Sequence, residues 1–384
     1  GKTASKRIRQ NRTMIKRKNL NYLFISLIFI LAVPAAILAA VMGAAGPGEK
    51  ILFVAWLFVP SPVILLIMLW RQFPRLVAIA AKTYISLSIV LTILLLIGVA
   101  WTGSETALHP EPASDEESLS DYPELYKNAE PITFVAGDGV KLAGWIAVAD
   151  SNEAVILLHG YTGDRKTMLP QADMLFQAGL TVLLFDFRHR GESEGEFVTF
   201  GYYEKQDVLA AVNLLESLSD KTDQKVNVDI SSIGLLGLSN GGATAILFAA
   251  ENPGRVEAIV TEDVFKSLDS AVSQSFTHFI GLPAFPFAPI TVWFSELRTG
   301  LKRKDVIPEE AVMNLIDTPI FIIHGLEDET ISFKDSEAIY SNAKQPKELW
   351  LVPEAEHGDA FDIAGDEYRQ RVLGFFKKNL RTSR

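Results

Sequence analysis

Three stretches within the first 104 residues contain no charged side chain: Asn19–Gly48, Ile51–Trp70 and Thr83–Ser104. A helix needs about 20 apolar residues to cross the roughly 30 Å hydrocarbon core of a bilayer, and each stretch is long enough. The alternative is a cleavable signal peptide followed by two core helices of a soluble domain. A signal peptide has an apolar region of only about 7–15 residues, however, and is not followed by two more such stretches. We therefore predict a membrane domain at 19–102 with three transmembrane helices.

Charge is distributed very unevenly along the chain. Residues 1–102 hold twelve basic and one acidic side chain, a net charge of +11, and the remainder holds 24 basic and 45 acidic side chains, a net charge of -21. The acidic remainder lacks the clustered positive charge that phosphate contacts require, so we expect no nucleic acid among the partners. The basic N-terminal segment 1–18 is followed at once by apolar sequence, which indicates a membrane flank.

Basic residues flanking the predicted spans indicate their orientation. Eight precede the first span and three lie between the second and third, whereas the loop between the first two holds only Lys50. Short cytoplasmic flanks are enriched in Lys and Arg. We therefore predict a multi-pass protein of the cell membrane whose large C-terminal domain lies outside the cytoplasm. The orientation reverses if the second span, which contains Pro60 and Pro62, is re-entrant.

The chain contains no cysteine. This excludes disulfides, thiolate nucleophiles and cysteine-ligated metal centres. No other cluster of metal-ligand residues stands out, and the glycine-rich segments do not form a Walker A loop. We therefore expect neither a metal nor a cofactor.

The composition changes twice beyond the third span. Residues 103–130 are rich in Ser, Pro, Asp and Glu, which predicts an acidic, solvated linker. From residue 131 onward, short β-branched runs alternate with amphipathic segments, as in an α/β sheet covered by helices on both faces. Gly137–Gly139 joins the first two runs without a helix, which predicts an edge hairpin. The predicted strands are 131–136, 142–149, 154–159, 180–186, 232–238, 256–262, 319–325 and 348–353, and the clearest helices are 167–178, 202–218 and 242–251.

The fifth predicted strand continues into Gly237-Leu238-Ser239-Asn240-Gly241 and then into a helix. This is the G-x-S-x-G pattern in the strand–turn–helix context that a nucleophile elbow requires. The sharp turn projects the Ser239 hydroxyl from the sheet, and the glycines remove side chains that would collide with neighbouring backbone. The start of the helix supplies free N–H groups for a developing oxyanion. The pattern indicates Ser239 as a nucleophile.

With this motif in place, residues 131–382 resemble the α/β-hydrolase superfamily. The segment His159–Gly163 is similar to the HG-x motif after the third strand, and Asp186–Ser193 to the D-x-R-G-x-G-x-S segment after the fourth, with His189 where the first glycine is usual. The letters LLHGYTGDRKTM look like the membrane-anchored bacterial branch related to the serine-aminopeptidase-like hydrolases. The resemblance implies a mostly parallel eight-stranded sheet with flanking helices and a short cap in a catalytic domain at 131–384.

The chain order in this fold is nucleophile, acid, histidine. Among the histidines after Ser239, His357 follows the last predicted strand and is expected to be the general base. His324 lies inside a strand, where we expect it to pack or hold a loop, and His278 lies in the cap segment.

The acid is expected after the seventh strand. Asp328 matches the family position in G-x-x-D, and Glu327 and Glu329 flank it as competitors. Glu262 or Asp263, after the sixth strand, is the alternative.

The remaining site predictions concern the oxyanion hole and the substrate pocket. Backbone N–H groups of Tyr161 and Asn240 are expected to hold the oxyanion, with His159 as a structural loop residue.

The segment 263–318, between the sixth and seventh predicted strands, is too long for a simple crossover and is rich in aromatic residues, which predicts a cap. We expect this cap to line an acyl pocket with Phe265, Phe279 and Trp293. The alternatives are that these aromatics only pack on the sheet, or that the cap dips into the membrane interface.

Together these features predict a membrane-anchored serine hydrolase that cleaves carboxylic esters or thioesters of a small-molecule or lipid acyl substrate through a Ser239–His357–Asp328 triad and an acyl-enzyme. One alternative is a serine peptidase, since the same triad cleaves amides. Another is a non-catalytic α/β-hydrolase-like binding protein. The motifs define neither the acyl chain length nor the oligomeric state.

Overall fold

The computed structural model describes residues 74–112, 117–219 and 230–380. The chain divides into two compact units, one formed by Gly1–Leu95 with Ile280–Leu282, the other by Leu96–Phe279 with Pro283–Arg384. The predicted basic segment 1–18 and the first two predicted spans lie outside the described residues.

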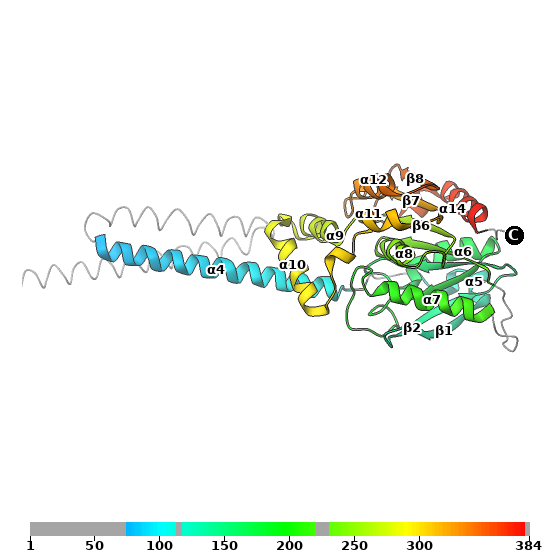
Figure 1. Cartoon of the computed structure of the whole chain (residues 1–384), viewed down its shortest axis with the longest axis horizontal. Coiled ribbons are helices and arrows are strands. Elements are labelled where there is room, and N and C mark those ends of the chain that lie inside the picture. Colours follow the sequence, from blue (N-terminus) through cyan, green and yellow to red (C-terminus); the bar gives the residue numbers. More distant parts are fainter. Residues whose placement is uncertain (1–73, 113–116, 220–229, 381–384) are drawn as a thin grey trace, which may run out of the picture. The chain divides into compact units, whose positions relative to one another are not determined.

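The first long element is the helix α4 (Pro74–Leu108), shown in Figure 1. An 18-residue window within its segment Ala81–Leu108 has a mean hydropathy of 2.4 and is 6% buried, and within the described ranges this is the one helix long and apolar enough to cross a membrane. Ile85, Leu91 and Leu94 are each more than half exposed. A helix that is apolar on all sides and exposed needs an apolar surrounding. This helix contains the third predicted span, Thr83–Ser104.

Eight strands form one sheet in the order β1-β2-β4-β3-β5-β6-β7-β8. The pairs β1·β2 and β2·β4 are antiparallel and all others are parallel. The predicted strands, including the edge hairpin, are confirmed within two residues at each end. Their bounds are β1 Ala129–Val135, β2 Lys141–Ala147, β3 Glu153–Leu158, β4 Thr181–Phe185, β5 Ser232–Leu238, β6 Ala258–Glu262, β7 Ile320–Gly325 and β8 Lys347–Val352.

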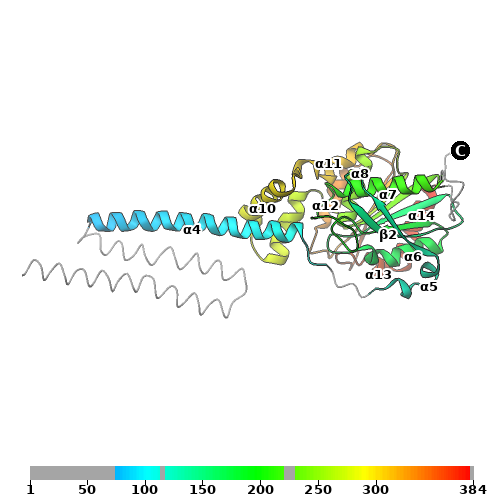
Figure 2. The same ribbon diagram turned by 90° about the horizontal axis from the view of Figure 1, so that it is seen from below.

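Helices cover both faces of the sheet. Figure 2 shows α7 (Glu204–Ser219) and α8 (Asn240–Glu251) on one face, and α6 (Leu169–Gln177) and α14 (Asp366–Asn379) on the other. The helices α12 (Phe333–Asn342) and α13 (Ala360–Ala364) connect the last strands to α14. The central strands β3, β4, β6 and β7 are buried almost throughout, which explains their unbroken apolar sequence.

Much of the segment 103–130, predicted as a solvated linker, is helical and partly buried. The helix α4 continues to Leu108, and a 3₁₀ turn (Leu119–Asp121) and α5 (Pro123–Asn128) precede β1. Leu108 and Leu125 are almost completely buried. Leu108 and Leu125 therefore pack this segment against the domain. The average composition of the segment is acidic and polar, so it does not indicate this packing.

The predicted cap at 263–318 is a set of short helices between β6 and β7. These are α9 (Leu268–Ser275), a π-helical turn (Phe276–Ile280), α10 (Ala284–Thr299), a 3₁₀ turn (Arg303–Asp305), α11 (Pro308–Ala311) and a second 3₁₀ turn (Val312–Asn314). The end of α4 packs on this cap. Thr291 Oγ1 donates to the carbonyl oxygen of Ala100 at 3.3 Å, and Ser295 Oγ lies 3.2 Å from Ser104 Oγ.

Candidate active site

The backbone at Ser239 adopts a strained conformation between β5 and α8. Its φ is 51° and its ψ is -111°, a combination that L-residues rarely adopt. A Cβ atom on Gly237 would lie 2.5 Å from the carbonyl carbon of Gly241, and one on Gly241 would lie 2.0 Å from the carbonyl oxygen of Leu158. The strand, turn and helix thus approach each other so closely that only glycine fits on either side of Ser239.

Asp328 and His357 are brought together by the loops that follow β7 and β8. His357 Nδ1 donates to Asp328 Oδ2 at 2.7 Å, and Asp328 Oδ1 accepts the backbone N–H groups of Thr330 and Ile331 at 2.8 Å each. Burial opposes the ionised form of Asp328, but hydrogen bonds from His324 and His357 outweigh it and hold its pKa well below the ordinary value. Burial likewise opposes protonation of His357, but the bond to Asp328 raises the net pKa of this histidine.

The loop carrying His357 lies beside the serine turn. A Cβ atom on Gly358 would lie 3.6 Å from Leu238 Cδ2, directly before Ser239 in the chain. Within the described residues, no hydrogen bond joins Ser239 Oγ to His357. Such bonds are often long in free enzymes and tighten when substrate binds. The structure therefore places the three predicted residues at one edge of the sheet, with the acid–histidine pair formed.

His324 contacts the same carboxylate, a relationship that was not predicted from the sequence. Its Nε2 lies 3.2 Å from Asp328 Oδ2 and 2.9 Å from the carbonyl oxygen of Ile331, and its Nδ1 lies 2.7 Å from Ser336 Oγ. Because a carbonyl oxygen only accepts, Nε2 carries a hydrogen. The expected loop-holding role of His324 is thus met through Ile331. Its place near the carboxyl end of β7 is the signal that could have pointed to the site.

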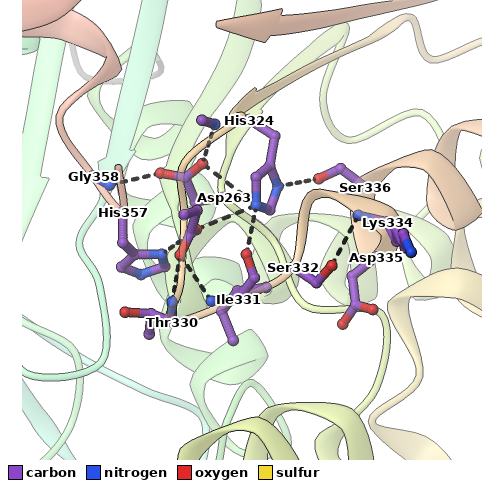
Figure 3. A network of polar contacts seen from close by, with 12 residues as sticks. Asp263, His324, Thr330, Ile331, Ser332, Lys334, Asp335, Ser336, His357 and Gly358 are labelled. Carbon is purple, nitrogen blue, oxygen red and sulfur yellow. Dashed lines mark hydrogen bonds and ion pairs between the residues drawn. The ribbon is translucent and has the colours of Figure 1, made fainter. Parts of the chain in front are cut away.

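Asp263 ties the two loops to each other rather than holding His357. Its Oδ1 accepts the N–H of Gly325 at 2.9 Å and its Oδ2 accepts the N–H of Gly358 at 2.6 Å. Figure 3 shows the contact between Asp263 and Gly358. Glu262 accepts a hydrogen bond from Tyr368 at 2.9 Å, and burial raises its pKa. The hydrogen-bonded partner of His357 is therefore Asp328, and not the alternative acids after the sixth strand.

Three side chains at this edge come close enough to ligate a metal ion. Potential ligand atoms of Asp263, Asp328 and His357 lie within 4.8 Å of one another. Both oxygens of Asp263 already accept backbone N–H groups, and His357 Nδ1 is bonded to Asp328. Hydrogen bonds within the chain therefore account for this cluster without an ion.

The predicted oxyanion donors follow the neighbouring parallel strands β3 and β5. Asn240 is the first residue of α8, and the first N–H groups of a helix have no partner within it. Tyr161 follows β3 with its half-buried ring stacked on Phe200 at 4.9 Å between ring centroids. His159 has the expected structural role: Nδ1 bonds the carbonyl oxygen of Gly160 at 2.7 Å and Nε2 accepts the N–H of Phe187 at 3.0 Å. Burial lowers the pKa of His159 to about 4, so it is neutral.

Charged residues after β4 brace the loops next to this site. Asp186 accepts the backbone N–H of Arg165 at 2.8 Å and pairs with its guanidinium, and Arg188 is held between Asp207 and Asp138 at 2.6 and 2.7 Å. His189 has a φ of 61°, so the turn keeps a left-handed residue at the position where the D-x-R-G-x-G-x-S pattern has glycine. The segment 186–193 thus stabilises the neighbouring loops through hydrogen bonds and ion pairs.

The predicted pocket residues fall into two environments. Phe265 is buried, with its ring 6.3 Å from that of Phe200, which in turn stacks on Tyr161. Phe279 and Trp293 are 66% and 54% exposed. The structure therefore places Phe265 near the oxyanion loop and the other two aromatic rings on the outside of the cap.

Comparison with known proteins agrees with this fold. Residues 149–263 match the family model described as serine aminopeptidase, S33. The chain is 27% identical over 305 residues to the uncharacterized protein YqkD of Bacillus subtilis, covering 77% of this chain and 96% of that protein. The thiohydrolase aneE of Aspergillus aculeatus is 37% identical over 124 residues, which is 31% of this chain and 37% of that enzyme.

A solved structure extends the similarity to three dimensions. The esterase Pf2001 of Pyrococcus furiosus superposes with a TM-score of 0.58 at 25% identity, covering 71% of this chain and 98% of the esterase. The sheet order and these matches show that the chain has an α/β-hydrolase fold. Its similarity is to hydrolases of the serine-aminopeptidase and esterase type.

Proposed function

We propose that the protein is a membrane-anchored serine hydrolase that cleaves carboxylic esters or thioesters of acyl substrates. The observation that carries this proposal is the 2.7 Å bond between His357 and Asp328 beside the strained turn at Ser239. The similarity to an esterase and, over a shorter stretch, to a thiohydrolase supports this substrate class.

The proposed reaction follows from these positions. The Ser239 hydroxyl attacks the substrate carbonyl carbon while His357 Nε2 takes its proton. Asp328 fixes the hydrogen on Nδ1 of His357 and stabilises the imidazolium, and the backbone N–H groups of Tyr161 and Asn240 bind the oxyanion. Collapse of this intermediate expels the alcohol or thiol with the proton from His357 and leaves an acyl-serine. Water, deprotonated by His357, then releases the acid.

Anchoring by α4 is part of the proposal. The exposed apolar surface of its segment Ala81–Leu108 supports it, and the basic flanks support a multi-pass arrangement with the catalytic domain outside the cytoplasm. Labelling of a Tyr126→Cys variant in intact cells with a membrane-impermeant maleimide tests the orientation, because the chain has no other cysteine and Tyr126 is 59% exposed. Labelling of intact cells is expected, and labelling only after lysis would place the domain inside.

Labelling of membranes with a fluorophosphonate probe tests the nucleophile. The wild type should be labelled and Ser239→Ala should not, whereas Ser231→Ala, which changes an exposed serine in the approach to β5, should be labelled like the wild type. A wild type that resists labelling while folded would contradict the proposal and favour a non-catalytic binding protein.

The family model supports a second candidate, a serine peptidase. The same triad attacks amides, so the discrimination depends on substrate. Turnover of a panel of acyl esters, acyl thioesters and aminoacyl amides separates the two. Faster amide than ester turnover would promote the peptidase.

A further inference from the structure

The helix α10 of the cap packs against the C-terminal end of α4. Ala100 and Ser104 are one turn apart on α4, and they contact Thr291 and Ser295, one turn apart on α10. A Cβ atom on Gly103 would lie 3.0 Å from Thr291 Oγ1, so the two backbones approach closely. The two helices therefore run in the same direction at this contact, and the intervening residues lie at matching levels.

The apolar part of α4 ends where α4 contacts α10. Ile97 and Trp101 are 44% and 49% exposed, and Glu105 is the first charged residue of α4 after Lys82. Arg298 of α10 pairs with Glu105, and its guanidinium lies 5.0 Å from the centre of the Trp101 ring. Tryptophan and arginine side chains commonly lie at the boundary between lipid and water.

The outer face of the cap is apolar at the same level. Trp293 and Leu297 are one turn apart on α10 and are 54% and 66% exposed. Phe285, whose backbone is extended near the start of α10, is 80% exposed. Trp293 contacts Phe294, whose ring meets Trp101 edge-on at 5.5 Å. We name this surface the cap patch: Phe285, Trp293 and Leu297.

Exposed basic residues follow the cap patch directly. Lys302, Arg303 and Lys304 come after Gly300, where α10 ends, and all three are exposed. An apolar face bordered by lysine and arginine is the pattern of elements that lie in the interface of an anionic bilayer. The remainder of the chain beyond residue 102 carries a net charge of -21, so this basic turn is a local exception.

We propose that the cap patch and the basic turn at 302–304 bind the interface of the same anionic bilayer that α4 crosses. The inference rests on the membrane anchoring in the proposed function and deepens it. Trp293 is linked to Trp101 through Phe294, so a bilayer interface that reaches Trp101 reaches the cap patch as well. The proposal gives Trp293 a lipid-binding role in place of the pocket-lining role predicted from sequence. It also brings acyl substrates held in the bilayer to the cap.

The absence of native cysteine allows a direct test on the full chain. Single variants Trp293→Cys and Leu297→Cys, with Tyr126→Cys as the control, are labelled with an environment-sensitive fluorophore. Tyr126 lies on α5 and is 59% exposed, comparable with Trp293. Each labelled protein is reconstituted into vesicles of phosphatidylcholine with phosphatidylglycerol. Quenching is then measured with aqueous iodide and with spin-labelled lipid.

The proposal expects labels at 293 and 297 to be quenched by the spin-labelled lipid and several times less by iodide than the label at 126. Replacing Lys302, Arg303 and Lys304 together by Gln should reduce lipid quenching in vesicles with phosphatidylglycerol and leave it unchanged in phosphatidylcholine alone. Equal iodide quenching at all three positions would overturn the proposal. The labels at 293 and 297 could also be protected from iodide only at a high ratio of protein to lipid and without quenching by spin-labelled lipid. That result would show that a second copy of the chain covers the cap patch, and it would overturn the proposal too.

Flotation of the same vesicles separates this inference from the proposed function. Protein that fails to float with vesicles would refute the anchoring and the inference together. Protein that floats, reacts with the fluorophosphonate probe and still exposes its labels to water would refute the inference alone.

Discussion

The phenolic oxygen of Tyr161 donates to the carbonyl oxygen of Ala107 at 2.8 Å, and it also lies 3.0 Å from that of Thr106. Tyr161 is the residue whose backbone N–H is proposed to bind the oxyanion, and Ala107 lies in the last turn of α4. The end of the apolar helix is therefore attached to the loop that forms the candidate oxyanion hole. Arg190 reinforces this attachment by donating to carbonyl oxygens of Pro110 and Thr162 at 2.8 and 2.9 Å.

The first prediction concerns this attachment. Tyr161→Phe keeps the ring and its stacking on Phe200 but removes the hydrogen bond, which typically contributes about 1 kcal/mol to stability. We expect kcat for a soluble ester to fall with little change in KM, by less than the roughly 10²–10³-fold that follows loss of an oxyanion donor itself. Tyr126→Phe, on an exposed ring, is the control. An unchanged kcat in Tyr161→Phe would show that the attachment does not position the loop.

The second prediction concerns pH. Burial lowers the pKa of His357, but the bond to Asp328 and the charges of Asp328, Asp263 and Glu262 outweigh it and raise the net pKa above the ordinary value. A general base acts in its neutral form, so kcat/KM should fall as the pH drops through this raised value. Asp263→Asn removes one of the charges and should move the acidic limb of the profile to lower pH. A shift to higher pH would contradict the electrostatic role of Asp263.

The third prediction concerns the serine turn. Gly241→Ala would place its Cβ atom 2.0 Å from the Leu158 carbonyl oxygen, a clash of backbone that cannot rotate away. We expect a loss of about 3 kcal/mol or more in the free energy of unfolding, at the upper end for overpacking. Gly374→Ala is the control, because no atom lies within 4 Å of its added Cβ. In α14 it should be neutral or stabilising by up to about 1 kcal/mol. Urea unfolding in detergent measures both, and equal stabilities would refute the steric argument.

The fourth prediction concerns Arg188, the buried arginine in the segment 186–193 after β4. Arg188 lies between Asp207 and Asp138, and burial raises the pKa of Asp207 to about 7 even with Arg188 hydrogen-bonded to it. Arg188→Ala leaves this carboxyl without its counter-charge and should cost about 3–5 kcal/mol of stability. Arg255→Ala breaks the more exposed pair with Glu216 and should cost less than about 1 kcal/mol. Similar losses in the two variants would contradict the burial argument.

The sheet was predictable because its signal is local. Strands buried on both faces leave unbroken apolar runs in the sequence, so the strands were placed within two residues. The elbow was predictable for a similar reason, since a turn this tight admits only glycine at 237 and 241. The linker was not, because Leu108 and Leu125 are single apolar residues whose burial depends on surfaces far away in the chain.

The sequence by itself determined the apolar third span, the strand pattern, the serine turn and the candidates for acid and base, because each depends on a short run of residue types. Only the tertiary structure decided that Asp328, and not Glu262 or Asp263, bonds His357, because loops after β6, β7 and β8 meet at one edge of the sheet. It also decided that the helix α4 ends against Tyr161 and α10, since contacts between residues 54 to 191 positions apart leave no trace in a local pattern.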